Sequence, residues 1–238
     1  MISPALRWSK SISSFNPIPN GCVFYAPLWH PSLSGPVFQS IDSYGHTCTR
    51  VGGVMSGDGF TTDGDDYIDC GNDSSLRFTT QSFTLLIWFK SSTAATQILI
   101  QKDTKVASTP AVGYGLYLRS SNPYFKVFVT DGTTFVANDV CATNPADGGW
   151  HFCAGTFNSV TDTVEVFIDT VSQDTEVAGA AIGSIDDAST TFEIGRDINL
   201  GAPQYYFTGS IDEVWAYNRA LTTTEMLHIY NTTNWRYS

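Results

Sequence analysis

The chain has 238 residues, of which 42% are hydrophobic and 13% aromatic, while only 15% are charged. This composition excludes an acidic disordered chain and a coiled coil, and the length suits one large all-β domain. The 23 acidic side chains outnumber the 12 basic ones, so the net charge of −11 argues against nucleic acid as a partner. No apolar run approaches the roughly 20 residues of a membrane helix, so we expect no membrane insertion.

Residues 1–20 are predicted to form an N-terminal arm, followed by a single domain at 21–238. The arm contains Arg7 and Lys10 but no acidic residue, and Pro17-Ile-Pro19 interrupts the chain before the first strand-like run. A basic arm on an acidic body is suited to docking on other proteins of an assembly or to self-association. The segment also lacks the apolar core of a secretory signal, so export by that route is not expected.

From residue 22 onward, short runs rich in β-branched and aromatic residues alternate with turn residues, which is typical of antiparallel sheets. The run SFTLLIWFK at 82–90 is apolar on both faces and is expected in the centre of a covered sheet. Asp131-Gly132 separates two such runs and predicts a hairpin with a type I′ turn. The other strands are expected at 23–28, 67–70, 97–101, 114–119, 124–130, 133–140, 150–157, 163–169, 191–195 and 205–217.

One short helix is expected near the C-terminus. Thr222 and Glu225 have the spacing of a capping box, and the apolar residues Met226, Leu227 and Ile229 follow. About eleven strands and one short helix, with no internal repeat, predict an all-β fold: a two-sheet antiparallel jelly-roll sandwich. The five cysteines include no C-x-x-C pair, so we expect buried thiols rather than a disulfide scaffold or a zinc site.

Several blocks of sequence resemble the laminin G-like, concanavalin A-like lectin/glucanase family. They are FTTDGDDYI at 60–68, the 82–90 strand, GWHF at 149–152 and the closing block FTGSIDEVWAYNRAL at 207–221 with Glu225. One departure is Asp169-Thr170, where the family usually has Asp-Gly, which leaves the turn type there open. The opening YAPLWHP at 25–31 is similar to that of laminin G-like proteins encoded by tailed phages.

The resemblance also covers glycoside hydrolases, so we looked for their carboxylates. A retaining enzyme places two carboxylates about 5–5.5 Å apart, which on a strand requires alternate positions of one face. The corresponding strand here, GYGLYLR at 113–119, contains no carboxylate. Glu165 and Asp169 share a strand but lie about 13 Å apart at roughly 3.3 Å per residue. We therefore predict no catalytic residues and no enzyme activity.

Calcium is the metal that the sequence suggests. One short stretch contains the five aspartates Asp63, Asp65, Asp66, Asp69 and Asp73, and Ca²⁺ prefers carboxylate and carbonyl oxygens. The resemblance implies a structural Ca²⁺ held by loop carbonyls and an Asp near the closing strand, a position that Asp212 matches. Strand alternation places Asp212 on the core side with Val214, where a carboxylate needs a cation or backbone N–H groups. Asp63 and Asp212 are the candidate ligands, and a hydrogen-bonded Asp212 is the alternative.

A set of aromatic and guanidinium side chains is the candidate ligand-binding site. Aromatic faces stack on sugar rings, and the arginine fork donates to hydroxyls or carboxylates. Alternation places Tyr117 and Arg119 opposite Leu116 and Leu118, on the strand where relatives carry their active groups. The candidates are Tyr117, Arg119, Tyr205, Tyr206 and Trp29, and ordinary packing is the alternative for each.

These observations predict a non-catalytic structural or binding protein. The first hypothesis is a phage virion component, a capsid decoration or tail-associated protein, at the virion surface. Its arm would bind other virion proteins and its jelly roll would contact cell-surface glycans. The alternative is an extracellular carbohydrate-binding module, and a glycoside hydrolase of the same fold is third.

Overall fold

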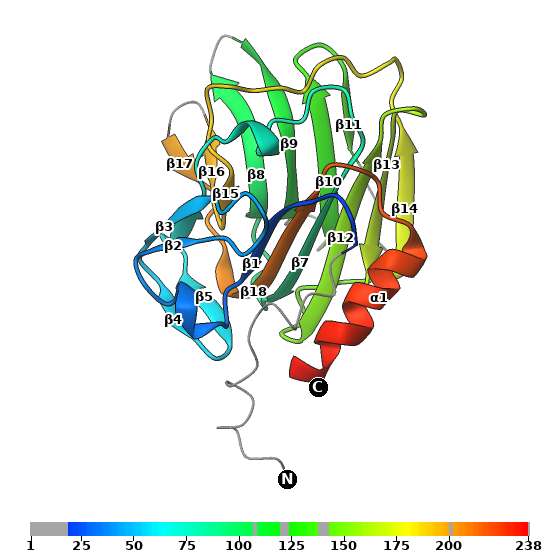
Figure 1. Cartoon of the computed structure of the whole chain (residues 1–238). Helices are drawn as coiled ribbons and strands as arrows, with labels where there is room; N and C mark the ends of the chain where they lie inside the picture. Colours follow the sequence, from blue (N-terminus) through cyan, green and yellow to red (C-terminus); the bar gives the residue numbers. More distant parts are fainter. Residues whose placement is uncertain (1–18, 107–108, 120–123, 138–142, 200–201, 238) are drawn as a thin grey trace.

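The computed structural model describes residues 19–106, 109–119, 124–137, 143–199 and 202–237. Within these residues, eighteen strands form two sheets that pack face to face (Figure 1), which confirms the predicted two-sheet sandwich. The strand pairs are antiparallel, apart from a parallel bridge between Asn199 and Lys105. The predicted N-terminal arm lies outside the described residues, except for its last two positions. No helix in the described ranges is long and apolar enough to cross a membrane.

The first sheet, called the back sheet here, carries the C-terminal helix. Its order is β14 (Val171–Val177), β13 (Thr163–Ile168), β12 (Trp150–Asn158), β7 (Phe83–Lys90), β18 (Thr208–Tyr217), β5 (Gly59–Asp63) and β4 (Val54–Ser56), and β1 (Cys22–Pro27) also pairs with β18. Strand β7 lies between β12 and β18, and all its residues except Lys90 are buried. The predicted central strand is therefore confirmed.

The second sheet, called the front sheet, carries the candidate site. Its order is β11 (Phe135–Ala137), β10 (Tyr124–Asp131), β9 (Thr109–Arg119), β8 (Gln97–Val106), β15 (Glu193–Ile194), β6 (Tyr67–Asp69), β3 (Thr47–Val51) and β2 (Val37–Gln39). Two short strands, β16 (Asp197–Asn199) and β17 (Ala202–Gln204), pair with each other beside β8.

Two hydrophobic clusters hold the layers together. The larger lies between the sheets and takes alternate side chains from both, such as Leu85 and Ile87 from β7 with Leu116 and Leu118 from β9. The smaller joins the outer face of the back sheet to α1 (Thr223–Thr233), whose Met226 and Ile229 are fully buried. Thr222 caps α1 in a reciprocal capping box with Glu225, as predicted.

The strands that the sequence did not reveal are short or polar. Strands β2 to β5 occupy 37–63, where glycine and serine interrupt the pattern, and the edge strand β14 exposes most of its side chains. Such strands exist because a neighbour completes their hydrogen bonds, which a single-strand pattern does not record. The predicted strand at 205–217 begins only at Thr208, since Tyr205 has a φ of 50°.

The structure corrects one predicted turn and defines another that the sequence left open. The β10–β11 hairpin is present, but Gly132 has a positive φ and Asp131 does not, so the predicted type I′ turn is wrong. The Asp131 carboxylate instead accepts from the backbone N–H groups of Thr133 and Thr134. At the other turn, Asp169 (φ 50°) and Thr170 (φ 71°) both lie in the left-handed region. The chain thus adopts there, without glycine, a backbone that glycine favours.

Candidate functional site

A hollow of about 620 Å³ opens on the outer face of the front sheet, the face turned away from the core. Strands β8 to β11 form it, and the segment around β16 and β17 closes one side. Its lining combines aromatic, acidic and hydroxyl side chains: Thr96, Ile98, Asp103, Ala111, Tyr117, Arg119, Phe128, Thr130, Phe135, Asp197 and Tyr205.

Two glycines on β9 allow close packing on the outer face of the sheet beside the hollow. Alternation places Gly113 and Gly115 on the same outer face as Tyr117. A Cβ atom at Gly115 would lie 2.5 Å from Phe128 Cε1, and one at Gly113 would lie 2.6 Å from Asp103 Cα. Gly113 also has a φ of 138°, which disfavours any other residue. The two glycines therefore let Phe128 and Asp103, which line the hollow, lie close to β9.

Aromatic side chains form the walls of the hollow. Tyr117 on β9 meets Phe128 on β10 edge to face, with ring centroids 5.7 Å apart. Phe135 on β11 and Tyr205 after β17 are exposed at the rim, with 60% and 44% of their surfaces accessible. Exposed rings around a concavity on a sheet are flat apolar surfaces available to a ligand.

The floor is polar and buried. Gln101 Nε2 donates to Asp103 Oδ1 on the same strand and to Asp197 Oδ1 on β16, so one amide joins two carboxylates from different strands. All three side chains are almost completely buried. Gln101 Oε1 is buried as well and has no hydrogen-bond partner among the described residues. A buried carbonyl oxygen in this state is one that a donor from a ligand or water would satisfy.

A second, smaller hollow of about 230 Å³ shares the lining residue Asp103 with the first and is also lined by Gln101. Its other lining residues are Ser189, Thr190, Thr191, Glu193 and Arg196. The Arg196 guanidinium donates to both Glu193 oxygens, at 2.5 and 2.8 Å, and lies 3.3 Å from the Tyr67 ring centroid. Burial alone would lower the pKa of Arg196, but its pairing with Glu193 outweighs burial and raises the pKa.

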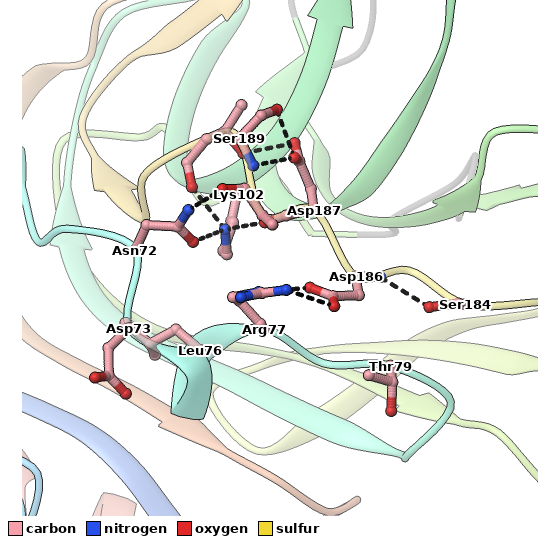
Figure 2. A network of polar contacts seen from close by, with 12 residues as sticks. Asn72, Asp73, Leu76, Arg77, Thr79, Lys102, Ser184, Asp186, Asp187 and Ser189 are labelled. Atoms are coloured by element: carbon pink, nitrogen blue, oxygen red, sulfur yellow. Dashed lines mark hydrogen bonds and ion pairs between the residues drawn. The ribbon is translucent and has the colours of Figure 1, made fainter.

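A buried lysine holds the loop that borders the second hollow. Lys102 Nζ donates to Asn72 Oδ1 at 2.8 Å and to the backbone carbonyls of Asp187 and Thr190 at 2.7 and 2.6 Å (Figure 2). Because burial strips water from the ammonium and these acceptors are uncharged, the pKa of Lys102 falls to about 8. Arg77 and Asp186 form a bidentate pair beside it. These contacts fix 186–190 against the sandwich.

The structure brings three of the five predicted ligand-binding residues together. Tyr117, Arg119 and Tyr205 line the larger hollow. Tyr206 instead lies beside Tyr67, with ring centroids 6.5 Å apart. Trp29 lies apart from this site: its Nε1 donates to Glu213 at 3.0 Å and its ring packs under a guanidinium near the C-terminus. Trp29 is therefore tied into packing on the back-sheet side, which was the stated alternative.

The predicted metal ligand Asp212 already has partners within the chain. Asp212 Oδ2 accepts from Arg236 at 2.7 Å and from the Tyr237 hydroxyl at 2.8 Å, and Oδ1 accepts from the Trp29 backbone N–H at 3.1 Å. These contacts match the hydrogen-bonded alternative for Asp212. A register shift between Ile211 and Val214 also breaks the expected alternation. As a result, Glu213 is buried beside the same cluster, 3.9 Å from Arg236.

The other predicted ligand, Asp63, lies in a carboxylate cluster at the end of β5. One oxygen each of Asp63, Asp65 and Asp66 falls within 4.8 Å of the others. The pKa of Asp63 is raised, first by its hydrogen bond to Asp65 and then by the charge of Asp66. Asp63 pairs with Thr208 on β18, four positions before Asp212, so the two predicted ligands belong to different clusters. Calcium binding by this chain stays a prediction.

Sequence reasoning missed Gln101, Asp103 and Asp197. Asp103 falls just beyond the strand predicted at 97–101, and Asp197 lies 96 positions after Gln101 in the chain. Only the pairing of β8 with β15 and the bridge to β16 bring them together. The alternation of polar Gln101 and Asp103 around Lys102 was the one available signal.

Comparisons with known proteins identify the family. The family model described as Concanavalin A-like lectin/glucanases superfamily, a laminin G-like model, matches residues 62–226. This match covers well over half of the chain, so the protein belongs to that superfamily. A search of curated proteins finds no match.

Solved structures with a similar fold include carbohydrate-binding and receptor-binding domains. The CBM40 of Ruminococcus gnavus IT-sialidase bound to α2,6-sialyllactose has 17% identity and a TM-score of 0.59, over 76% of this chain and 97% of that chain. The same domain bound to α2,3-sialyllactose has 18% identity and a TM-score of 0.58, over 71% of this chain and 92% of that chain. The binding domain of botulinum neurotoxin serotype D has 12% identity and a TM-score of 0.60, over 92% of this chain and 53% of that chain. At these identities the likeness establishes a shared fold.

Proposed function

We propose that this protein is a non-catalytic, glycan-binding jelly roll and that the larger hollow on its front sheet holds a sugar unit. The observation that carries the proposal is the hollow itself, where exposed Phe135 and Tyr205 flank a floor of hydrogen-bonding groups. Aromatic faces stack on the apolar faces of sugar rings, and polar side chains set the orientation of the hydroxyls. The fold shared with carbohydrate-binding modules supports the proposal.

Removal of a rim aromatic tests this proposal. If a sugar covers about 50 Å² of one ring, the contact contributes about 1.3 kcal/mol, or about tenfold in Kd. Phe135→Ala and Tyr205→Ala are each expected to weaken binding of lactose or sialyllactose by about that factor. Both rings are exposed, so melting temperatures should change little. Tyr44→Ala, which removes an exposed ring on another loop, is the matched control. Equal losses in all three variants, or none in the rim variants, would contradict the proposal.

The absence of catalysis is part of the proposal, although two carboxylates lie close together on the floor. Asp197 is fully buried and Asp103 nearly so, and Gln101 lies between them. A glycosidase nucleophile must reach the anomeric carbon, and an acid must reach the glycosidic oxygen. Both carboxylates are almost completely buried and each accepts from the Gln101 amide, so we propose that they orient hydroxyl groups without reaching the glycosidic bond, and we expect no release of reducing sugar from laminarin. Release that disappears in Asp103→Asn would support the glycoside hydrolase instead.

The setting in which the domain acts is proposed from the sequence. We propose display on a phage virion, on the basis of the YAPLWHP opening and the basic residues Arg7 and Lys10; an extracellular carbohydrate-binding module is the alternative. Deletion of residues 1–18 is expected to leave the sandwich folded and to abolish co-sedimentation with virions. A truncated protein that still sediments fully with the particles would contradict docking through the arm.

A further inference from the structure

Two thiols of the core face each other across neighbouring strands of the front sheet. Cys48 lies on β3 and Cys70 follows directly after β6, and neither lines the hollows described above. The two strands pair in antiparallel register with Thr49 opposite Asp69, so the next position along the same register sets Cys48 opposite Cys70. The Cys48 thiol donates to the Cys70 sulfur, and the two sulfurs are 2.9 Å apart.

The backbone geometry at this position suits a covalent link. The Cys70 N–H donates to the Phe192 carbonyl at 2.9 Å, so its backbone groups point toward β15 and away from β3. The Arg50 N–H donates to the Pro36 carbonyl at 2.8 Å on the β2 side, and Cys48, two positions earlier, faces the same way. Opposite residues whose backbone groups point away from each other have Cα atoms about 4.5 Å apart. A disulfide spans Cα distances of about 4.4–6.8 Å, so the bond requires little movement of either strand.

Both sulfurs are inaccessible to reagents in the folded protein. Cys48 is completely buried and Cys70 is 2% exposed, and both belong to the cluster between the sheets. Burial, followed by the hydrogen bond with Cys48, raises the pKa of the Cys70 thiol well above its ordinary value. Thiol–disulfide exchange requires a thiolate that can reach the sulfur it attacks. The pair therefore exchanges slowly with any disulfide in solution once the sheets have packed.

We infer that Cys48 and Cys70 form a redox site whose state is set while the chain folds. In the presence of a small disulfide such as oxidised glutathione, the two thiols become a disulfide before the sheets have packed. When the chain folds under reducing conditions, the native protein keeps both residues as thiols, and later addition of the small disulfide does not link them. The inference is independent of the proposed sugar binding.

The reaction is an exchange in two steps. One protein thiolate attacks the glutathione disulfide, which forms a mixed disulfide and releases one glutathione thiolate. The other protein thiolate then attacks the protein sulfur of the mixed disulfide and releases the second glutathione. The two protein thiols thus lose two electrons to the glutathione disulfide, and their two protons end on the glutathione sulfurs.

The link should stabilise the part of the front sheet that is built from short strands. Between residues 48 and 70 the chain leaves the front sheet, forms β4 and β5 of the back sheet, and returns as β6. A disulfide that closes this loop restricts the unfolded chain and so favours the folded state. For a domain of this size, we expect the oxidised protein to melt about 5–10 °C above the reduced protein.

Refolding the full chain from urea with oxidised or reduced glutathione tests the inference. Trypsin releases residues 11–50, which contain Cys22 and Cys48, and residues 51–77, which contain Cys70. After unfolding and alkylation of free thiols, the oxidised sample should give these two peptides as a linked pair, with the bond assigned to Cys48 by fragmentation. Cys48→Ala should lose the pair and the gain in melting temperature. Cys22→Ala, which removes the other cysteine of the same peptide, should keep both.

A third sample, native reduced protein incubated with oxidised glutathione, tests when the link forms, and we expect it to remain unlinked. Complete alkylation of Cys48 and Cys70 after oxidative refolding, or a link to another cysteine instead, would overturn the inference. Linkage of the native sample as fast as that of the unfolded chain would overturn the timing, because burial would then give no protection. The wild-type comparison needs no variant, so it decides the question even if Cys48→Ala does not fold.

Discussion

The ion pair between Arg236 and Asp212 joins the C-terminal segment to the sandwich, and its loss should be costly. Arg236 donates to Asp212 Oδ2 at 2.7 and 3.2 Å, and its guanidinium lies 4.2 Å from the Trp29 ring centroid. Substitution Arg236→Met keeps most of the side-chain volume but leaves the Asp212 carboxylate buried without a cation.

The size of the effect follows from the burial of the pair. Breaking a buried ion pair by removing one partner costs about 3–5 kcal/mol. Tyr237 and the Trp29 backbone N–H still donate to Asp212, so we expect the lower end, about 3 kcal/mol. For a domain of this size, that loss corresponds to a decrease of about 6–12 °C in melting temperature.

Urea unfolding at pH 7, followed by tryptophan fluorescence, measures the change in the free energy of unfolding. The matched control is Arg219→Met, which removes a pair with Glu225 in which both side chains are about one-third exposed. Solvent-exposed pairs contribute at most about 1 kcal/mol, so the control should remain close to wild type. Equal losses in the two variants, or a loss below about 1 kcal/mol for Arg236→Met, would refute the reasoning.

Three further substitutions are expected to change stability. Burial, followed by the charge of Asp212, raises the pKa of Glu213 from 4.5 to about 8. The stability that protonated Glu213 contributes is therefore complete below pH 4.5 and is lost as the pH rises to about 8. Between pH 5 and pH 9 the melting temperature should fall less for Glu213→Gln than for the wild type. Parallel curves would contradict this. Lys102→Met leaves three oxygens without their donor, so the free energy of unfolding measured in urea should fall by about 2–3 kcal/mol. Residues 183–191 should also become sensitive to protease, and a loop that stays protected would contradict the role of the lysine. Thr170→Gly removes the strain of a left-handed backbone conformation, so it should stabilise the protein by about 1 kcal/mol. A lower melting temperature for this variant would contradict the presence of backbone strain at Thr170.

The sequence predicted the features that depend on local patterns. The apolar β7, the Thr222–Glu225 capping box and the alternation that places Tyr117 and Arg119 on one face were all readable from neighbouring residues. Features that depend on contacts between distant segments were not. Gln101 meets Asp197 through strand pairing, and a bulge in β18 places Glu213 beside Asp212.

Cys48–Cys70 and Arg236 are two more contacts between distant segments that the sequence did not predict. The sequence indicated buried thiols, but only the pairing of β3 with β6 brings Cys48 to Cys70. It also indicated that Asp212 needed a partner, but not that Arg236, 24 positions later, would supply it. In both cases the sequence predicted the chemical character of the residue, whereas the fold determined which residue lies next to it.

The central claim is that the front-sheet hollow binds a sugar, and amide NMR shifts during a lactose titration test it most directly. We predict saturable shifts confined to residues around the hollow, such as Asp103, Tyr117, Asp197 and Tyr205. Phe135→Ala should weaken the titration and Tyr44→Ala should leave it unchanged. Shifts that cluster instead around Trp29, or no shifts with any glycan tried, would contradict the account.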